Sequence, residues 1–162
     1  MLTIEDIKGY NLFAGLNEKE LLVIAKLCNR ETYEANTVLF DPDNTTSDIL
    51  LLEGGNDSIQ IEVPISSGGT KIVIHILSKG ETFGWASLSP VHIRTAQART
   101  IEKATVIRID SKQLTQLLEE NNHMGYLVMR NLSGIISSRL SYTTVAFRHE
   151  IQKMRKRAAI LS

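Results

Sequence analysis

The residues best suited to binding chemistry lie in one segment, Phe83-Gly84-Trp85-Ala86-Ser87-Leu88, which is followed by Arg94 and Thr95. Ala86–Leu88 are predicted to begin a helical turn, and the free backbone N–H groups at such a start attract an anion. Arg94 stands nine residues after Trp85, so it can return across that turn and place its planar guanidinium on the same anion. Thr95 adds a hydroxyl donor. The segment therefore predicts a phosphate-binding cassette.

The elements that must position this cassette are short strands. Between about residues 32 and 110, short apolar runs and alternating apolar and polar residues are separated by turn clusters. This density of strands and turns favours a sandwich, barrel or jelly roll. We therefore predict a mainly β fold with flanking helices, namely a β-roll (double-stranded jelly roll) with N-terminal helices and a long C-terminal dimerisation helix. The predicted strands are Thr37–Phe40, Ile49–Leu52, Ile59–Val63, Ile72–Leu77, Gln97–Ile101 and Ala104–Ile109.

Helical patterns flank the strands on both sides. Glu18–Cys28 is predicted to be a helix, because its apolar residues recur at steps of three and four and Asn17 forms a capping box with Glu20. After the strands, Asp110 is predicted to cap another helix together with Gln113. The length and composition suit one compact domain. Its predicted parts, within residues 1–162, are an N-terminal helical part (1–31), a β-roll (32–110, with the cassette at 83–96) and C-terminal helices (111–157).

The last helix is the longest element that the sequence predicts. A helix over residues 123–157 would be roughly 50 Å long at about 1.5 Å per residue, longer than the β-roll can cover. Its apolar stripe therefore needs a partner, and a second copy of the chain is the simplest one. The alternative is that the stripe packs only on its own roll. The stripe consists of Met129, Leu132, Ile136, Leu140, Thr143, Phe147, Ile151 and Met154.

At the cassette the sequence resembles the cyclic-nucleotide-binding domain family, which includes the catabolite activator protein and the regulatory subunits of cyclic-nucleotide-dependent kinases. That family's cassette has the pattern Phe-Gly-Glu-(Leu/Ile)-Ala-Leu, a short loop, then Arg-(Ala/Ser/Thr)-Ala. The resemblance covers residues 12–157 and implies a ligand sensor that binds a cyclic nucleotide, cAMP most simply. The matching residues are Phe83, Gly84, Ala86 or Ser87, Leu88, Arg94, Thr95 and Ala96, with Leu12-Phe13-Ala14-Gly15-Leu16 as the N-terminal signature.

Trp85 is the one departure from the family's cassette. It stands where the family has a glutamate that accepts a hydrogen bond from the ribose 2′-hydroxyl, and an indole can only donate. A buried hydroxyl left unpaired costs about 1–3 kcal/mol. Trp85 either stacks on a purine or fills the ribose space, or else belongs to the hydrophobic core. The resemblance therefore predicts the fold more firmly than the ligand.

A second resemblance lies on the long helix. Residues 132–144 resemble the helix of the catabolite activator protein that ends in Thr-Ser, where the hydroxyl pair contacts the purine, one residue from each protomer. Thr143 and Thr144 occupy those two places, so the resemblance adds them to the predicted binding site. The alternative is that Thr143 is a polar residue of a dimer interface.

Composition excludes several other classes of protein. The 18 basic residues balance 18 acidic ones, which is not the charge of a general nucleic-acid binder. The single cysteine, Cys28, can form neither an intramolecular disulfide nor an iron–sulfur cluster. No signal peptide and no membrane-spanning stretch are predicted, so we expect a cytoplasmic protein. No metal-ligand or nucleophile pattern supports catalysis, so we predict no enzyme, no cofactor and no metal.

The sequence therefore predicts a ligand-sensing regulatory module that binds a cyclic nucleotide or a related anionic effector and signals through a C-terminal dimer helix to an unknown protein partner. Only five residues follow Arg157, so no DNA-binding domain is expected in this chain. Two alternatives stay open. One is a diverged fold that binds no nucleotide and acts as a dimeric interaction module. The other is the sensor half of a truncated Crp/Fnr-type transcription regulator.

Overall fold

The β-roll is built from two antiparallel sheets. The computed structural model describes residues 2–42, 48–55, 57–65, 69–89 and 94–161. Its strands are β1 (Cys28–Tyr33), β2 (Val38–Phe40), β3 (Asp48–Gly54), β4 (Ile59–Pro64), β5 (Lys71–Leu77), β6 (Thr82–Phe83), β7 (Gln97–Thr100) and β8 (Ala104–Asp110). They form two four-stranded sheets with the orders β1-β8-β3-β6 and β2-β7-β4-β5. The predicted β-roll is confirmed.

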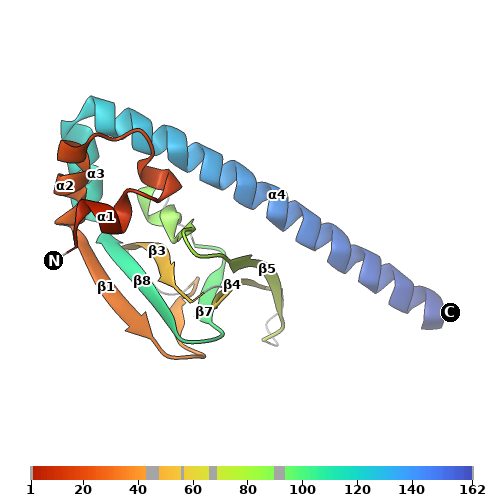
Figure 1. Ribbon diagram of the computed structural model, residues 1–162. Helices are drawn as coiled ribbons and strands as arrows, with labels where there is room; N and C mark the ends of the chain where they lie inside the picture. Colours follow the sequence, from red (N-terminus) through yellow and green to blue (C-terminus); the bar gives the residue numbers. More distant parts are fainter. Residues whose placement is uncertain (1, 43–47, 56, 66–68, 90–93, 162) are drawn as a thin grey trace.

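Helices lie at both ends of the chain and on one side of the roll. The N-terminal part contains α1 (Ile4–Ile7), the 3₁₀ turn η1 (Asn11–Phe13) and α2 (Glu18–Ala25). A second 3₁₀ turn, η2 (Trp85–Leu88), follows β6, and the chain ends with α3 (Ser111–Glu120) and α4 (Asn122–Leu161). Figure 1 shows α4 starting beside the N-terminal helices, passing over the roll near β5 and continuing beyond it. No helix in the described part of the chain combines the length and the apolarity that membrane crossing requires.

Local capping explains where α2 and α3 begin. The side chain of Asn17 accepts a hydrogen bond from the backbone N–H of Glu20 at 3.1 Å, and the backbone N–H of Asn17 donates to the carboxylate of Glu20 at 2.9 Å. Asp110 accepts from the N–H of Gln113 at 2.9 Å. Both predicted caps are confirmed, because each satisfies N–H groups that the helix itself leaves unpaired.

The predicted end of the α2 helix at Cys28 is wrong. The helix ends at Ala25, and Cys28 already belongs to β1, where it pairs with Ile109 of β8. The strand also starts before the predicted boundary of the roll at residue 32. Cys28 continues the apolar spacing of α2, but its pairing with β8 places it in a strand. Its side chain is buried.

Two hydrophobic cores hold these elements together. One lies between the N-terminal helices, the β1-β8-β3 sheet, α3 and the start of α4, and it includes Leu12, Ile107 and Val128. The other lies between the two sheets and includes Ile59 and Phe83. Because the first core contains residues of the roll and of α4, it fixes where α4 begins. That start determines which part of α4 passes over the cassette.

Candidate functional site

A cavity of about 480 Å³ lies between the β-roll and α4. This volume is within the range of small-molecule sites, which are roughly 300–1,000 Å³. Its walls come from three places: the interior of the roll, the cassette, and one face of α4. The lining residues are Phe40, Ile61, Val63, Ile74, Phe83, Gly84, Trp85, Ala86, Arg94, Thr95, Ala96, Ile136, Arg139, Leu140, Thr143 and Phe147.

The floor of the cassette is the turn that starts at Gly84. Gly84 has a φ of 72°, and a Cβ at this position would lie 2.9 Å from the carbonyl oxygen of Asp48. Only glycine accepts both the left-handed backbone and the close approach. The turn therefore brings the backbone of η2 against β3, directly after β6 ends at Phe83.

The hydrogen bonds of η2 determine which N–H groups face a ligand. Ser87 donates to the carbonyl oxygen of Gly84 through its N–H at 3.3 Å and its hydroxyl at 3.0 Å. The N–H groups of Trp85 and Ala86 come first in the turn, where no residue of the turn can accept from them. Because Gly84, Trp85 and Ala86 line the cavity, the end of the turn that faces the cavity lies one residue earlier than the predicted start at Ala86.

Arg94 supplies a positive charge beside this turn. Its guanidinium carbon lies 4.3 Å from the centre of the Phe40 ring, and Nη2 donates to the carbonyl oxygen of Asp48 at 3.3 Å. Partial burial lowers the pKa of Arg94, and the Asp48 carboxylate opposes that shift. The guanidinium remains charged at neutral pH because arginine starts from a pKa above 12. Arg94 and the Gly84 turn both contact Asp48, which explains how the two parts of the cassette come together.

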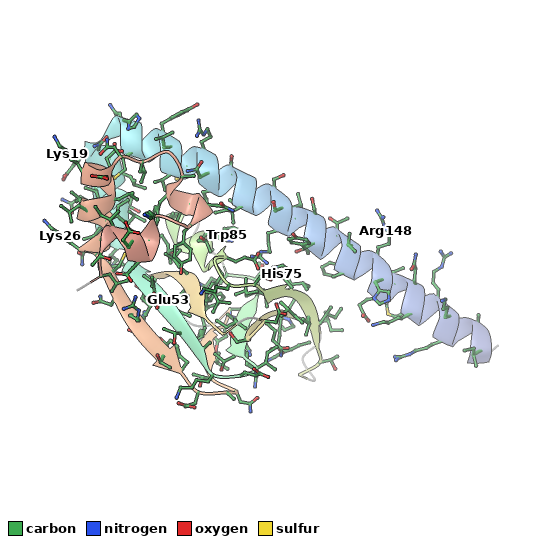
Figure 2. All side chains as sticks on the ribbon, viewed as in Figure 1. Lys19, Lys26, Glu53, His75, Trp85 and Arg148 are labelled. Atoms are coloured by element: carbon green, nitrogen blue, oxygen red, sulfur yellow. The ribbon has the colours of Figure 1, made fainter. Side chains whose placement is uncertain are left out.

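Trp85 lies where the hydrophobic core meets the cavity. Its side chain is partly buried and packs against the core shared by the N-terminal helices and α4. It also lines the cavity. Figure 2 shows Trp85 on the side of the roll that faces α4. An indole in this place links the apolar core to the ligand cavity.

The wall contributed by α4 contains a second arginine, Arg139. Only 9% of this residue is exposed. Its Nη2 lies 3.6 Å from Oε1 of Glu81, and its Nη1 is buried with no hydrogen-bond partner among the described residues. Burial lowers the pKa of Arg139 to about 10, against a smaller upward effect of Tyr142. The side chain is therefore cationic at neutral pH and only partly compensated.

Glu81 and His75 connect the roll to α4 beside this arginine. Nε2 of His75 lies 3.0 Å from both carboxylate oxygens of Glu81, and the N–H of Ser78 donates to Oε2 at 2.6 Å. The His75 ring stacks on Tyr142 of α4, with the ring centres 4.7 Å apart. Figure 2 shows His75 on β5, below α4. This histidine therefore has partners on both the roll and the helix.

The structure brings together seven of the predicted site residues. Thr143 reaches the cavity from α4, whereas Thr144 lies on a neighbouring face, where its hydroxyl donates to the carbonyl oxygen of Leu140 at 2.8 Å. Ser87 and Leu88 do not line the cavity, and residues 90–93 of the cassette lie outside the described residues. The seven that line it are Phe83, Gly84, Trp85, Ala86, Arg94, Thr95 and Thr143.

Sequence reasoning missed three residues of the cavity walls that carry charge or an aromatic ring, namely Arg139, Phe40 and Phe147. The signal for Arg139 was present, because it lies three residues after Ile136 and four before Thr143, on the same face of the helix. A charge inside an apolar stripe is the unusual feature. Phe40 has no comparable signal, because a buried aromatic residue at the end of a strand is usual in any core. Among the described residues, no group of three or more His, Cys, Asp or Glu side chains could hold a metal ion.

Comparisons with known proteins agree with this geometry. The family model described as cyclic nucleotide-binding domain matches residues 30–121. No curated protein sequence matches the chain. Among solved structures, a putative cyclic nucleotide-binding protein from Geobacter metallireducens GS-15 is 24% identical with a TM-score of 0.71, over 86% of this chain and 99% of that one.

Two further structures extend the likeness of fold to longer proteins. The catabolite activator protein of Thermus thermophilus is 22% identical with a TM-score of 0.68, over 85% of this chain and 62% of that one. The regulatory domain of Toxoplasma gondii PKA, solved with cAMP, is 18% identical with a TM-score of 0.60, over 67% of this chain and 40% of that one.

Proposed function

The chain belongs to the cyclic nucleotide-binding domain family, and we propose on this premise that it is a regulatory module that binds a cyclic nucleotide, cAMP most simply, or a related anionic effector, in the cavity beneath α4. The observation that carries the proposal is the position of Arg94. Arg94 lines the same cavity as Trp85 and Ala86, whose N–H groups come first in the turn. A planar cation and the N–H groups at the start of a turn together suit a phosphate.

The proposed pose has two ends. The phosphate lies on Arg94, on the hydroxyl of Thr95 and on the turn that starts at Gly84. The base lies towards Thr143 on α4, among the aromatic and aliphatic side chains of the walls. No bond is made or broken, so the module acts by binding alone. We expect it to act in the cytoplasm and to pass its signal to a protein partner.

Binding would be coupled to the position of α4. The cavity has one wall on the roll and one on the helix, so a ligand that contacts both favours the arrangement in which the two walls are closest. The part of α4 beyond the cavity exposes Ile151 and Met154, which suit packing against the same helix of a second copy. In such a homodimer, Thr144 faces away from its own cavity and is placed to approach the partner's ligand.

A calorimetric titration with cAMP tests the proposal, with cGMP and 5′-AMP as comparison ligands. We expect saturable binding of one cyclic nucleotide at micromolar or lower concentration, and loss of that binding in Arg94→Ala. Arg130→Ala is the matched control, because it removes an exposed arginine of α4 that does not line the cavity. Because Trp85 is the only tryptophan and lines the cavity, its fluorescence should change along the same titration.

The result that would overturn the pocket assignment is unchanged affinity in folded Arg94→Ala. Absence of binding by the folded wild type would instead favour the second candidate function, a dimeric interaction module that binds no nucleotide. Trp85 favours that candidate, because it lines the cavity where a hydroxyl acceptor would be needed and an indole only donates. Sedimentation of the same samples shows whether a dimer forms without ligand.

A third possibility is that this chain is the sensor part of a longer regulator. The chain spans 62% of the Thermus catabolite activator protein and 40% of the Toxoplasma PKA chain. The cavity and its proposed ligand are the same in either case. The two cases differ in what responds to α4: a separate protein partner for a stand-alone module, or another part of the same chain for a longer regulator.

A further inference from the structure

Glu81, the residue before β6, is a carboxylate shared by the roll and α4. From the roll, Nε2 of His75 lies 3.0 Å from both of its oxygens. From α4, Nη2 of Arg139 lies 3.6 Å from Oε1. The N–H of Ser78 donates to Oε2 at 2.6 Å. Two side chains that can be positively charged therefore approach one carboxylate from opposite sides of the boundary between roll and helix.

This cluster is largely shielded from water, so the charge state of each member affects the others. Only 13% of the His75 side chain and 11% of the Arg139 side chain are exposed. Burial raises the pKa of Glu81, although the N–H of Ser78 opposes that shift, and burial lowers the pKa of Arg139 to about 10. Arg139 is therefore cationic at neutral pH. Charges interact more strongly where the protein excludes water than they do at a surface.

The remaining neighbours of His75 leave Glu81 as its counter-charge. The ring stacks on Tyr142 of α4, with the ring centres 4.7 Å apart. The adjoining turns carry one charge of each sign, Lys79 and Asp57. Among the described residues, Glu81 is the carboxylate that pairs with His75. His75 does not line the cavity, so its effect on a ligand passes through its neighbours.

We propose that protonation of His75 weakens ligand binding by competing with Arg139 for Glu81, so that the module responds to acidification as well as to its ligand. This inference rests on the proposed function and adds a regulation of the same site. A neutral His75 donates a hydrogen bond from Nε2 and leaves the charge of Glu81 to Arg139. A protonated His75 places a second cation beside the same carboxylate, and the cluster then has a net positive charge.

A move of α4 away from the roll would relieve that repulsion, because it takes Arg139 away from His75. The ligand favours the opposite movement, since it contacts both walls of the cavity. An ordinary histidine gains its proton as the pH falls through about 6.5. Ligand binding should therefore release protons, and affinity should fall as the pH falls through this range. His75 acts here as a positioning residue.

Calorimetric titrations with cAMP at pH 7.5 and pH 5.5, at one ionic strength, test the inference. We expect the Kd of the wild type to be about fivefold higher at pH 5.5. His75→Gln can still donate to Glu81 but does not titrate, so its two Kd values should agree within twofold. Glu81→Gln removes the shared charge and should also flatten the dependence. His149→Gln is the matched control, because it removes an exposed histidine of α4 outside the cavity and should keep the fivefold ratio.

A count of the protons exchanged on binding separates this role from a purely structural one. Titrations near pH 6 in two buffers with different enthalpies of ionisation give that count. We expect the wild type to release about half a proton for each cAMP bound, and His75→Gln to release none. If His75 only supported the fold, its replacement would change the affinity equally at both pH values and leave the proton count as it is in the wild type.

The outcomes separate failure of the inference from failure of the proposed function. Saturable binding of cAMP with the same Kd at both pH values, or with a lower Kd at pH 5.5, would overturn the inference and leave the proposed function intact. A pH dependence that persists unchanged in folded His75→Gln would also overturn it, because another group would then take up the proton. No saturable binding by folded wild type at either pH would overturn the proposed function and the inference together.

Discussion

The two halves of α4 belong to different environments, although one uninterrupted helix contains both. In the first half, Met124 is 2% exposed and Val128 is 0% exposed, because both belong to the core with the N-terminal helices. In the second half, Val145 is 62% exposed and Met154 is 60% exposed. Figure 1 shows the same division, with the helix starting against the domain and ending beyond it.

The first half of α4 contributes to the stability of the fold, whereas the second half is the candidate for a response to ligand. The first half is fixed by apolar packing that the chain provides for itself. The second half begins at Tyr142, whose ring stacks on His75 of the roll, and its later residues Val145, Ile151 and Met154 are exposed. Elements that move in response to a ligand come from the less stable end of a structure. Under the proposed function, we therefore expect the second half of α4 to be the part whose position a ligand changes.

The largest expected effect is on the free energy of unfolding, and it should come from a charge placed in the first half of α4. Val128→Asp buries a carboxylate without a partner in the core, and we expect a loss of about 4 kcal/mol or more in the free energy of unfolding. Ile151→Asp makes the same chemical change in the exposed second half and should leave the fold intact. Urea unfolding followed by circular dichroism measures both. Equal losses in the two variants would contradict the division of α4.

The second-largest expected effect is on the stability of the proposed homodimer, which would form through the second half of α4. Ile151→Asp should raise the dimer dissociation constant about 100-fold, close to 2.7 kcal/mol, because two carboxylates would face each other in an apolar seam. His149→Asp is the matched control, since it lies on the other side of the helix, about 200° away. Sedimentation equilibrium gives the constants. If both variants dimerise like the wild type, the seam lies elsewhere.

The same division explains what the sequence could predict. Six of the strands, the Gly84 turn and the start of α3 follow from local signals, namely alternation, a tight turn and a cap. The strands that the sequence did not predict are β1 and β6. The length of α4 also follows, because its apolar steps continue through most of it. Local patterns predict these elements because alternation, turn residues and caps are visible within each segment, even though strands such as β3 and β8 pair over about 60 positions.

The parts that could not be predicted depend on distant residues. The end of α2 is decided by the pairing of Cys28 with Ile109, about 80 positions later. Arg139 enters the site only because α4 crosses the roll at one angle, which the shared core sets and periodicity does not reveal. The position of Thr144 outside its own cavity follows from helix geometry instead, because adjacent helical residues point about 100° apart and Thr143 faces inward.

Glycines on the two parts of α4 provide a smaller test. A Cβ on Gly125 would lie 2.6 Å from the carbonyl oxygen of Leu118 in α3, whereas a Cβ on Gly134 would meet nothing within 4 Å. We expect Gly125→Ala to reduce the free energy of unfolding by about 1–3 kcal/mol through overpacking. Gly134→Ala should increase it by up to about 1 kcal/mol, because alanine favours the helix. Opposite signs in thermal unfolding would support the tight packing of Gly125 against α3 and the open surroundings of Gly134, and equal signs would count against that difference.

The smallest expected effect is electrostatic and lies where α4 begins. Burial raises the pKa of Glu20, but hydrogen bonds from His123 and from the N–H of Asn17 outweigh it and hold that pKa below its usual value. A carboxyl with a lowered folded pKa stabilises the fold above the unfolded pKa of about 4.5 and loses that contribution as pH falls through the folded value.

The stability of the wild type should therefore approach that of Glu20→Gln as the pH falls below about 4.5, the unfolded value. Above it, up to about pH 6, the wild type should be the more stable protein, because the ionised Glu20 keeps its hydrogen bonds there. Urea midpoints from pH 6 to pH 3 measure the difference, with the exposed Glu119→Gln as control. A difference that stayed constant with pH would mean that the Glu20–His123 pair contributes no charge-dependent stability. The anchoring of the first half of α4 would then rest on apolar packing alone.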